Sequence, residues 1–200
     1  HAIAIGKRRT DYLFAVLFLD LDRFKTINDT AGHAAGDAVL RQMSQVLEDS
    51  CRNSDIVIRW GGDEFLIVAR DLNSDSLGVL VERIREKMEH HAFDTGDGQV
   101  VRTTCSIGFA SYPFHPTDID AFSWEQVISV ADQALYVAKT NGRNAWVGYS
   151  CNPDTPIHNL LGDIRHAPRR LLNEGHIEMT TSLQGEVSVL HPLNLFHEFI

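Results

Sequence analysis

Short apolar runs, separated by polar turns and by segments with helical periodicity, set the pattern of this chain. Residues 13–19 are all apolar and lead directly into Asp20 and Asp22. Such a run is too short to cross a membrane and too uniform for a half-exposed strand, so it predicts a central β-strand covered on both faces. Because side chains alternate along a strand, Asp20 and Asp22 would share one face where the strand ends.

Two further apolar runs, residues 56–60 and 65–69, flank the pair Gly61-Gly62. Glycine reaches the positive φ of a tight turn without strain, so this pattern predicts a β-hairpin. Asp63 and Glu64 follow the glycines and would stand where the turn enters the second strand. Considered alone, the segment is an acidic, solvent-exposed hairpin tip.

Apolar residues at helical spacing predict helices over residues 34–47, 74–88 and 124–138, with a shorter helix over 23–29. Further strands are expected over 100–111, where Gly108 indicates a bulge or a close approach, and over 145–148 as a closing strand. The order β-α-α-β-β-α-β-α-β contains a split β-α-β-β-α-β pattern. It predicts an α+β fold with a central, mostly antiparallel sheet and helices on both faces.

In that topology the first strand neighbours the hairpin, so Asp20 and Asp63 would lie at the same edge of the sheet. Acids at the end of a buried strand are costly unless they are solvated, paired or bound to metal. Capping of the next helix is a competing role for Asp22. For Asp20 we favour a divalent-metal site shared with Asp63.

Composition limits the partners. The 200 residues are 44% hydrophobic and 22% charged, which fits one substantial domain plus an extension, or two small domains. A net charge of −9 argues against a nucleic-acid surface but allows a nucleotide substrate, provided that metal ions and placed cations offset its phosphates. Cys51, Cys105 and Cys151 lack CxxC spacing and are expected to be structural thiols in a reducing compartment.

The chain begins at His1 rather than Met, so we expect it to be a piece of a longer polypeptide. From Tyr149 onward Asn, Asp, Pro and His become common. We therefore interpret residues 149–200 as an appended C-terminal extension without its own core, of unknown role. Residues 1–148 would form the main domain.

Four segments in a fixed order resemble a known family, the GGDEF domain of diguanylate cyclases, which make cyclic di-GMP from GTP. The resemblance covers about residues 11–148, and these segments are Gly61-Gly62-Asp63-Glu64-Phe65, residues 20–37, residues 105–110 and residues 131–144. It implies a palm-type nucleotidyl-cyclase fold. Each of two GTP molecules would use its 3′-hydroxyl to attack the other's α-phosphate, releasing pyrophosphate.

The resemblance also implies two divalent ions per active site, Mg²⁺ or Mn²⁺, as in other phosphoryl-transfer enzymes. Such ions prefer oxygen ligands. By resemblance Asp20 and Asp63 supply carboxylates, and Leu21 supplies its backbone carbonyl. Asp63, Glu64 and Lys139 are the implied catalytic residues, with Glu64 ligating or orienting.

The implied substrate-binding positions surround this centre. Phe24 and Lys25 would contact the terminal phosphates, and Lys139 and Arg143 would bind the triphosphate by their charge. Gly61 and Gly62 would let the backbone approach the nucleotide closely. Asn28 and Asp37 match the pair that reads guanine. The competing roles are a turn residue for Asn28 and a helix cap for Asp37.

The segment from Arg52 to Asp55 has the R-x-x-D spacing of the family's inhibitory product site, in which Arg binds the O6 and N7 atoms of guanine. Arg83 matches a secondary arginine of that site. A surface ion pair is the competing role for an isolated R-x-x-D. One domain would hold one GTP, so catalysis is expected from a homodimer.

The D-x-L-T-x-L-x-N-R segment with which family members usually begin is absent, so we expect the isolated fragment to be weakly active or inactive. Two alternatives stay open: a non-catalytic cyclic di-GMP receptor that uses Arg52 and Asp55, and a cyclase for another nucleotide, which depends on Asn28 and Asp37. We expect sensor or receiver domains in the longer protein. The domain itself should face the cytoplasm, whether or not that protein is membrane-anchored.

Overall fold

The computed structural model describes residues 14–70, 74–96 and 98–189. The helices in these ranges are α1 (Phe24–Ala31), α2 (His33–Glu48), α3 (Ser74–His90), α4 (Trp124–Thr140), α5 (Leu160–His166) and α6 (Pro168–Asn173). The strands are β1 (Phe14–Leu21), β2 (Ile56–Gly61), β3 (Glu64–Arg70), β4 (Phe93–Asp94), β5 (Val100–Val101), β6 (Cys105–Tyr112), β7 (Trp146–Cys151) and β8 (Ile177–Thr181). Within these ranges no helix is long and apolar enough to span a membrane.

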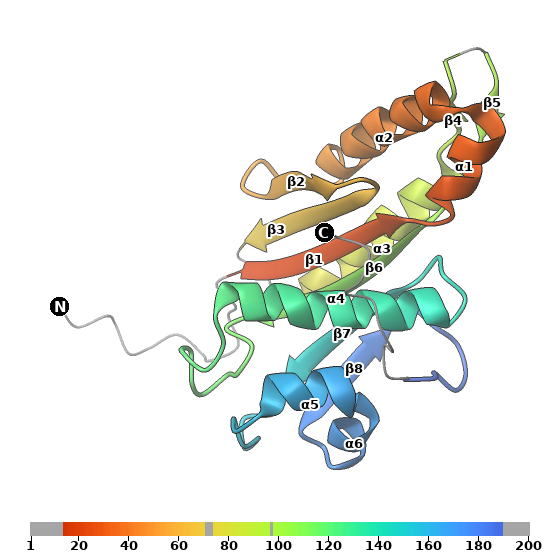
Figure 1. Ribbon diagram of the computed structural model, residues 1–200. Helices are drawn as coiled ribbons and strands as arrows, with labels where there is room; N and C mark the ends of the chain where they lie inside the picture. Colours follow the sequence, from red (N-terminus) through yellow and green to blue (C-terminus); the bar gives the residue numbers. More distant parts are fainter. Residues whose placement is uncertain (1–13, 71–73, 97, 190–200) are drawn as a thin grey trace.

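The main sheet has the strand order β2-β3-β1-β6-β7-β8 (Figure 1). Neighbouring strands are antiparallel except for the parallel pair β6–β7. β1 lies between β3 and β6, and it is buried from Ala15 to Leu21, which confirms the predicted central strand. Asp20 is paired with Glu64 of β3, so the first strand and the hairpin are neighbours, as predicted.

Alternation along β1 divides the apolar core into two layers. Leu17 and Leu19 join a cluster with α2 and α3, whereas Val16 and Phe18 join a second cluster with α4, α5 and α6. α3 and α4 therefore cover opposite faces of the sheet, and Figure 1 shows them on its two sides. The period of two in the sequence thus fixes which helix each strand residue meets.

Gly108 brings α4 directly onto the sheet. A Cβ at this position would stand 2.0 Å from the carbonyl oxygen of Ala131 and 2.1 Å from the amide nitrogen of Leu135. Only a residue without a side chain permits that contact between backbones. The close approach predicted at Gly108 is therefore confirmed, and it fixes how closely α4 packs on this face of the sheet.

Two expected strands differ from the structure. Residues 100–111 are not one strand, because β5 pairs with β4 in a small separate hairpin and the sheet strand begins only at Cys105. Residues 145–148 do not close the sheet, because β7 continues to Cys151 and pairs on its outer side with β8. In both places the pairing is set by partners that local periodicity does not reveal.

The segment after Tyr149 packs against the domain that precedes it. Leu160, Ile164, Leu171 and Ile177 are buried in the second apolar cluster, and the Arg165 guanidinium donates to the Ser129 hydroxyl of α4 at 2.6 Å. The described part of this segment therefore shares the core of the main domain. The functional boundary at residue 148 stays a prediction.

Candidate active site

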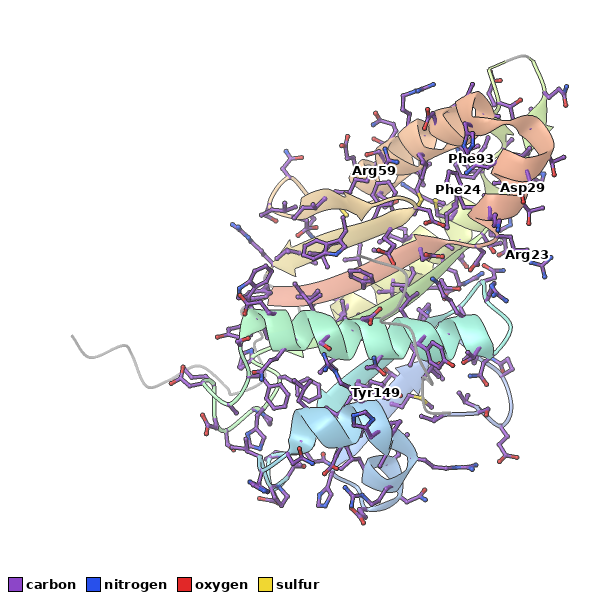
Figure 2. The ribbon with its side chains drawn as sticks, viewed as in Figure 1. Arg23, Phe24, Asp29, Arg59, Phe93 and Tyr149 are labelled. Carbon is purple, nitrogen blue, oxygen red and sulfur yellow. The ribbon has the colours of Figure 1, made fainter. Side chains whose placement is uncertain are left out.

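The hairpin turn presents open backbone at one end of the sheet. β2 ends at Gly61, β3 begins at Glu64, and Gly62 has φ 52°, which is the left-handed conformation expected of a turn glycine. The Arg59 guanidinium holds the turn through two hydrogen bonds to the carbonyl oxygen of Gly62, at 2.8 and 3.0 Å (Figure 2). Apart from the adjoining residues of the chain, no described atom lies within 4 Å of where a Cβ would stand on either glycine. A ligand could therefore approach this backbone closely.

Three elements bring charged groups together beside this turn. The Leu21 amide donates to the Asp63 carbonyl oxygen at 3.3 Å, which joins the end of β1 to the turn. On α4, the Lys139 ammonium lies 2.8 Å from the Asp20 carboxylate. Asp20, Asp63, Glu64 and Lys139 therefore form one group, which we call the carboxylate–lysine cluster.

Burial and mutual repulsion shape the electrostatics of this cluster. Burial raises the pKa of Asp20 to about 6; the nearby carboxylates of Asp63 and Glu64 raise it further, while Lys139 opposes the shift. Burial also raises the pKa of Glu64, again against Lys139. Ionised carboxylates in such a place are stabilised by a cation. A cation bound at the cluster would therefore stabilise the ionised form of these carboxylates.

The donor set suits a hard cation. In the part of the chain that the structure describes, no group of three or more His, Cys, Asp or Glu side chains is arranged to hold a metal. Two carboxylates and the Leu21 carbonyl are nevertheless the ligand type that Mg²⁺ accepts, since it keeps several waters and takes further oxygens from substrate phosphates. The residues present fit Mg²⁺ or Mn²⁺ bound together with a nucleotide.

Asp22 does not cap α1. The N-cap of α1 is Arg23, with no side-chain hydrogen bond, and Asp22 is buried. Its carboxylate instead accepts hydrogen bonds from the hydroxyls of Thr104 and Ser106, at 2.6 and 2.7 Å, and from the backbone amide of Asn144 at 3.0 Å. The capping role considered for Asp22 is wrong, and this residue ties β1 to β6 and to the loop after α4.

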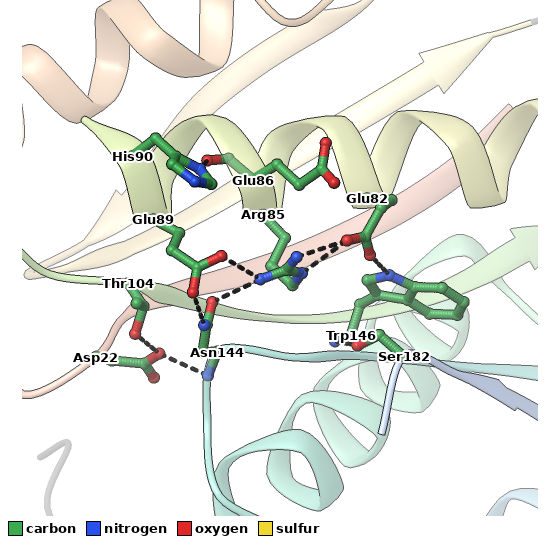
Figure 3. A network of polar contacts seen from close by, with 10 residues as sticks. All are labelled: Asp22, Glu82, Arg85, Glu86, Glu89, His90, Thr104, Asn144, Trp146 and Ser182. Atoms are coloured by element: carbon green, nitrogen blue, oxygen red, sulfur yellow. Dashed lines mark hydrogen bonds and ion pairs between the residues drawn. The ribbon is translucent and has the colours of Figure 1, made fainter. Parts of the chain in front are cut away.

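A second network continues from Asn144 to α3 (Figure 3). The Arg85 guanidinium donates to Glu82, Glu89 and the Asn144 side chain, while the Asn144 amide donates to Glu89 at 2.7 Å. The Trp146 indole donates to Glu82 at 2.6 Å. Sequence reasoning missed this network. The i, i+3 and i, i+4 spacing of Glu82, Arg85 and Glu89 signals pairs within one helix but not their link to Asn144.

The predicted phosphate contacts lie beside the cluster. Phe24 and Lys25 begin α1 directly after β1, and the first turn of α1 contains no acidic residue (Figure 2 labels Phe24). Arg143 follows α4 with φ 65°, and its amide donates to the Ala138 carbonyl at 3.1 Å. Its side chain is exposed and has no described ion pair or hydrogen bond. The chain therefore offers free positive charge at this edge.

The proposed guanine pair lies on α1 and α2. Asn28 is within α1 and Asp37 is in the second turn of α2, whose N-cap is Gly32, so neither the turn role nor the capping role considered for them holds. Asp37 is exposed. The Asn28 Oδ1 atom is buried and has no hydrogen-bond partner among the described residues. A buried acceptor without a partner is rare in folded proteins.

The predicted inhibitory residues gather at the start of β2. The Asp55 carboxylate accepts from the backbone amides of Arg52 and Arg70, at 2.8 and 3.1 Å, which orders the loop. The Arg83 guanidinium reaches the same loop and donates to the Ser50 carbonyl at 2.6 Å. The Arg52 side chain is exposed and forms no described ion pair, so the competing surface ion pair with Asp55 is absent from the described structure.

Comparisons with known proteins agree with this geometry. The sequence model of the family "Diguanylate cyclase, GGDEF domain" matches residues 1–145. Diguanylate cyclase DosC of Escherichia coli K12 is 42% identical over 136 residues, which are 68% of this chain and 28% of DosC. This chain thus spans less than a third of that relative's length.

Solved structures give the same answer. Diguanylate cyclase SiaD of Pseudomonas aeruginosa, in complex with its activator SiaC, aligns with a TM-score of 0.60 and 32% identity over 68% of this chain and 48% of that one. The GGDEF domain of DgcB from Caulobacter crescentus, in complex with c-di-GMP, aligns with a TM-score of 0.59 and 29% identity over 66% of this chain and 74% of that one. These neighbours confirm the predicted α+β fold class.

Proposed function

Because the chain belongs to the GGDEF family of diguanylate cyclase domains, we propose that it condenses two GTP molecules into cyclic di-GMP with release of pyrophosphate. One observation carries the proposal: the Asp20 carboxylate lies beside the hairpin turn and 2.8 Å from Lys139. Acids that can bind cations and an ammonium that can bind phosphate are thus adjacent. Phosphoryl transfer depends on this combination of positioning and charge.

Asp20 and Asp63, with the Leu21 carbonyl, are the proposed ligands of two Mg²⁺ or Mn²⁺ ions, and Glu64 ligates or orients. When bound, these ions would polarise the α-phosphate and stabilise the leaving pyrophosphate. Lys139 would contribute charge to the triphosphate from α4. The unusual burial of Asp20 supports this assignment, because a buried carboxylate needs a cation nearby.

The remaining substrate contacts follow from exposed groups around the cluster. Phe24 and Lys25 stand at the N-terminal end of α1, where free backbone amides favour phosphate oxygens. Arg143 can bind two phosphate oxygens at once. Gly61 and Gly62 leave the backbone open for a nucleotide, as the empty space around both supports. Each residue would bind or orient the substrate rather than transfer a proton.

Asn28 and Asp37 are proposed to select guanine. The Watson–Crick edge of guanine presents N–H donors, which a carboxylate or an amide oxygen accepts, whereas adenine presents an acceptor at the equivalent ring nitrogen. The unpaired Asn28 Oδ1 supports a donor from the ligand at this position. A competition of ATP against GTP tests this assignment.

Synthesis would require two copies of the domain, since each supplies one GTP and the product is two-fold symmetric. Arg52, Asp55 and Arg83 are the proposed product site, and the exposed side chain of Arg52 supports it. Product bound there would slow the enzyme. Sensor or receiver domains of the longer protein would bring two copies together.

The deciding assay is production of cyclic di-GMP from GTP and Mg²⁺ by the wild type, Asp63→Asn and Arg52→Ala. We expect Asp63→Asn to abolish synthesis and Arg52→Ala to keep it while product inhibition disappears. If the wild type binds cyclic di-GMP in a calorimeter but produces neither product nor linear intermediate, the receptor alternative replaces the cyclase.

A further inference from the structure

The segment that follows β8 returns to the end of the sheet where the carboxylate–lysine cluster lies. Its first contacts are with Trp146 at the start of β7: the Ser182 amide donates to the Trp146 carbonyl at 3.1 Å, and the Trp146 amide donates to the Ser182 hydroxyl at 2.9 Å. Beyond them, Leu183, Val187 and Val189 pack against the second apolar cluster. We call residues 182–189 the C-terminal strap. It lies outside the residues that match the family, which end at 145.

The strap is fastened to the end of α4 by a two-point contact. The Asn141 side-chain amide donates to the Ser188 carbonyl at 2.8 Å, and the Ser188 backbone amide donates to Asn141 Oδ1 at 2.7 Å. Both partner atoms on the strap belong to the backbone. Asn141 is two residues after Lys139, in the last turn of α4, and two before Arg143, in the loop that follows. The contact therefore lies between the two proposed phosphate ligands.

The backbone of this loop needs external support. Gly142, Arg143 and Asn144 have φ values of 114°, 65° and 47°, three successive left-handed residues of which two carry side chains. Such conformations are unfavourable for residues with a Cβ and persist only where the surroundings hold them. On one side the backbone amide of Asn144 donates to the Asp22 carboxylate. On the other side the Arg143 amide donates to the Ala138 carbonyl at 3.1 Å, and the contact between Asn141 and the strap adds a second restraint.

We propose that the C-terminal strap positions the triphosphate clamp, with Asn141 as the positioning residue that transmits its contact to Lys139 and Arg143. The inference rests on the proposed binding of GTP by those two residues. When the contact breaks, the loop relaxes toward more favourable backbone conformations. Lys139 and Arg143 are then correctly placed for the triphosphate in a smaller fraction of the molecules. A ligand then binds with an affinity reduced by the fraction of molecules that are competent.

The chain offers a matched pair of variants for the test. Ser188→Pro removes the backbone N–H that Asn141 accepts, whereas Ser188→Ala keeps both bonds, because the contact uses no side-chain atom of Ser188. Asn141→Ala removes the contact from the other side, together with the hydrogen bond from the Asn141 side chain to the Val137 carbonyl of α4, so Ser188→Pro is the more selective variant. Thermal unfolding of each variant reports whether the whole domain stays folded.

Two readouts separate positioning from general stability. The first is the rate of tryptic cleavage after Lys139 and Arg143 in the protein without nucleotide. The second is the Kd of a non-hydrolysable GTP analogue with Mg²⁺, with KM and kcat measured where turnover occurs. For Ser188→Pro and Asn141→Ala we expect faster cleavage, about 2- to 10-fold weaker binding for the loss of one or two hydrogen bonds, a raised KM and an unchanged kcat. Ser188→Ala should match the wild type.

If Ser188→Pro and Asn141→Ala lower the unfolding temperature while loop cleavage and nucleotide affinity stay at wild-type values, the strap only stabilises the fold and the inference is wrong. Equal cleavage and equal affinity in all the variants would overturn it as well. A wild type that binds the analogue but makes no product would refute the cyclase and leave the strap to be judged on cleavage and affinity.

Discussion

Replacing Gly36 by Ala should weaken GTP binding while strengthening the helix that contains it. Gly36 lies inside α2, facing the side chain of Asn28. A Cβ at this position would stand 2.0 Å from Asn28 Oδ1, so the carboxamide must retreat by about 1 Å to reach the 3.0 Å that real contacts respect. Phe24 Cζ, at 3.1 Å, must also give by a few tenths of an ångström.

The two consequences have opposite signs. Ala is favoured over Gly in a helix interior by roughly 1 kcal/mol, and moving the end of the Asn28 side chain costs the fold little. The displaced carboxamide, however, no longer meets guanine, and one lost hydrogen bond of about 0.5–1.5 kcal/mol weakens binding about 2- to 10-fold. We therefore expect a protein that is at least as stable as the wild type and binds GTP less well.

Calorimetry with a non-hydrolysable GTP analogue and urea unfolding measure the two effects. Gly78→Ala is the matched control, because Gly78 lies in α3 and no described atom stands within 4 Å of where its Cβ would be. It should show the helix gain alone. Wild-type affinity in Gly36→Ala would refute the guanine-reading role of Asn28. A marked loss of stability would show that the Phe24 ring cannot yield.

Three further changes test the packing and the charge networks. Gly108→Ala drives a methyl group into the backbone of α4 and should lower the free energy of unfolding by more than about 2 kcal/mol, measured by urea denaturation. Asp22→Asn, which replaces an acceptor-only carboxylate that serves three donors, should cost about 1–3 kcal/mol in the same assay. Hydrogen bonds from Arg85 lower the pKa of Glu82 and of Glu89 in the folded protein. These bonds therefore stabilise the fold fully above the pKa that the two carboxyls have in the unfolded chain, and the stabilisation is lost as the pH falls through their pKa in the folded protein. The destabilisation by Arg85→Met should therefore be clear at about pH 7 and shrink toward about pH 3, and a pH-independent difference in urea midpoint would contradict this reasoning.

The central strand and the hairpin were predictable because their signals are local. Seven successive apolar residues before Asp20 indicate a strand buried on both faces, and the glycine pair fixes the turn that carries Asp63. Their adjacency followed from the order of elements, and the pairing of Asp20 with Glu64 confirms it. Helical periodicity likewise predicted α4, although the helix continues to Thr140 rather than ending at Ala138 and so includes Lys139.

The contacts that hold the site were not predictable, because they join residues far apart in the sequence. Asp22 accepts from Thr104 and Ser106, 82 and 84 residues away, so the local signal of an acid before a helix indicated a cap that does not exist. Ile58 and Trp60 belong to the apolar run that predicts the hairpin but are 38% and 50% exposed, because β2 is an edge strand. No short window of sequence reveals which strand ends at the edge.

The antiparallel pairing of β8 with β7 affects how domains of this family can be exchanged between proteins. The family match ends at residue 145, one residue before β7, yet β7 and β8 lie in the same sheet as β1. A fusion that ended there would leave β6 as an unpaired edge with apolar residues of α4 uncovered, and such edges recruit other chains into aggregates. In a chimera, the transferable unit is therefore the catalytic fold together with its C-terminal segment through residue 189.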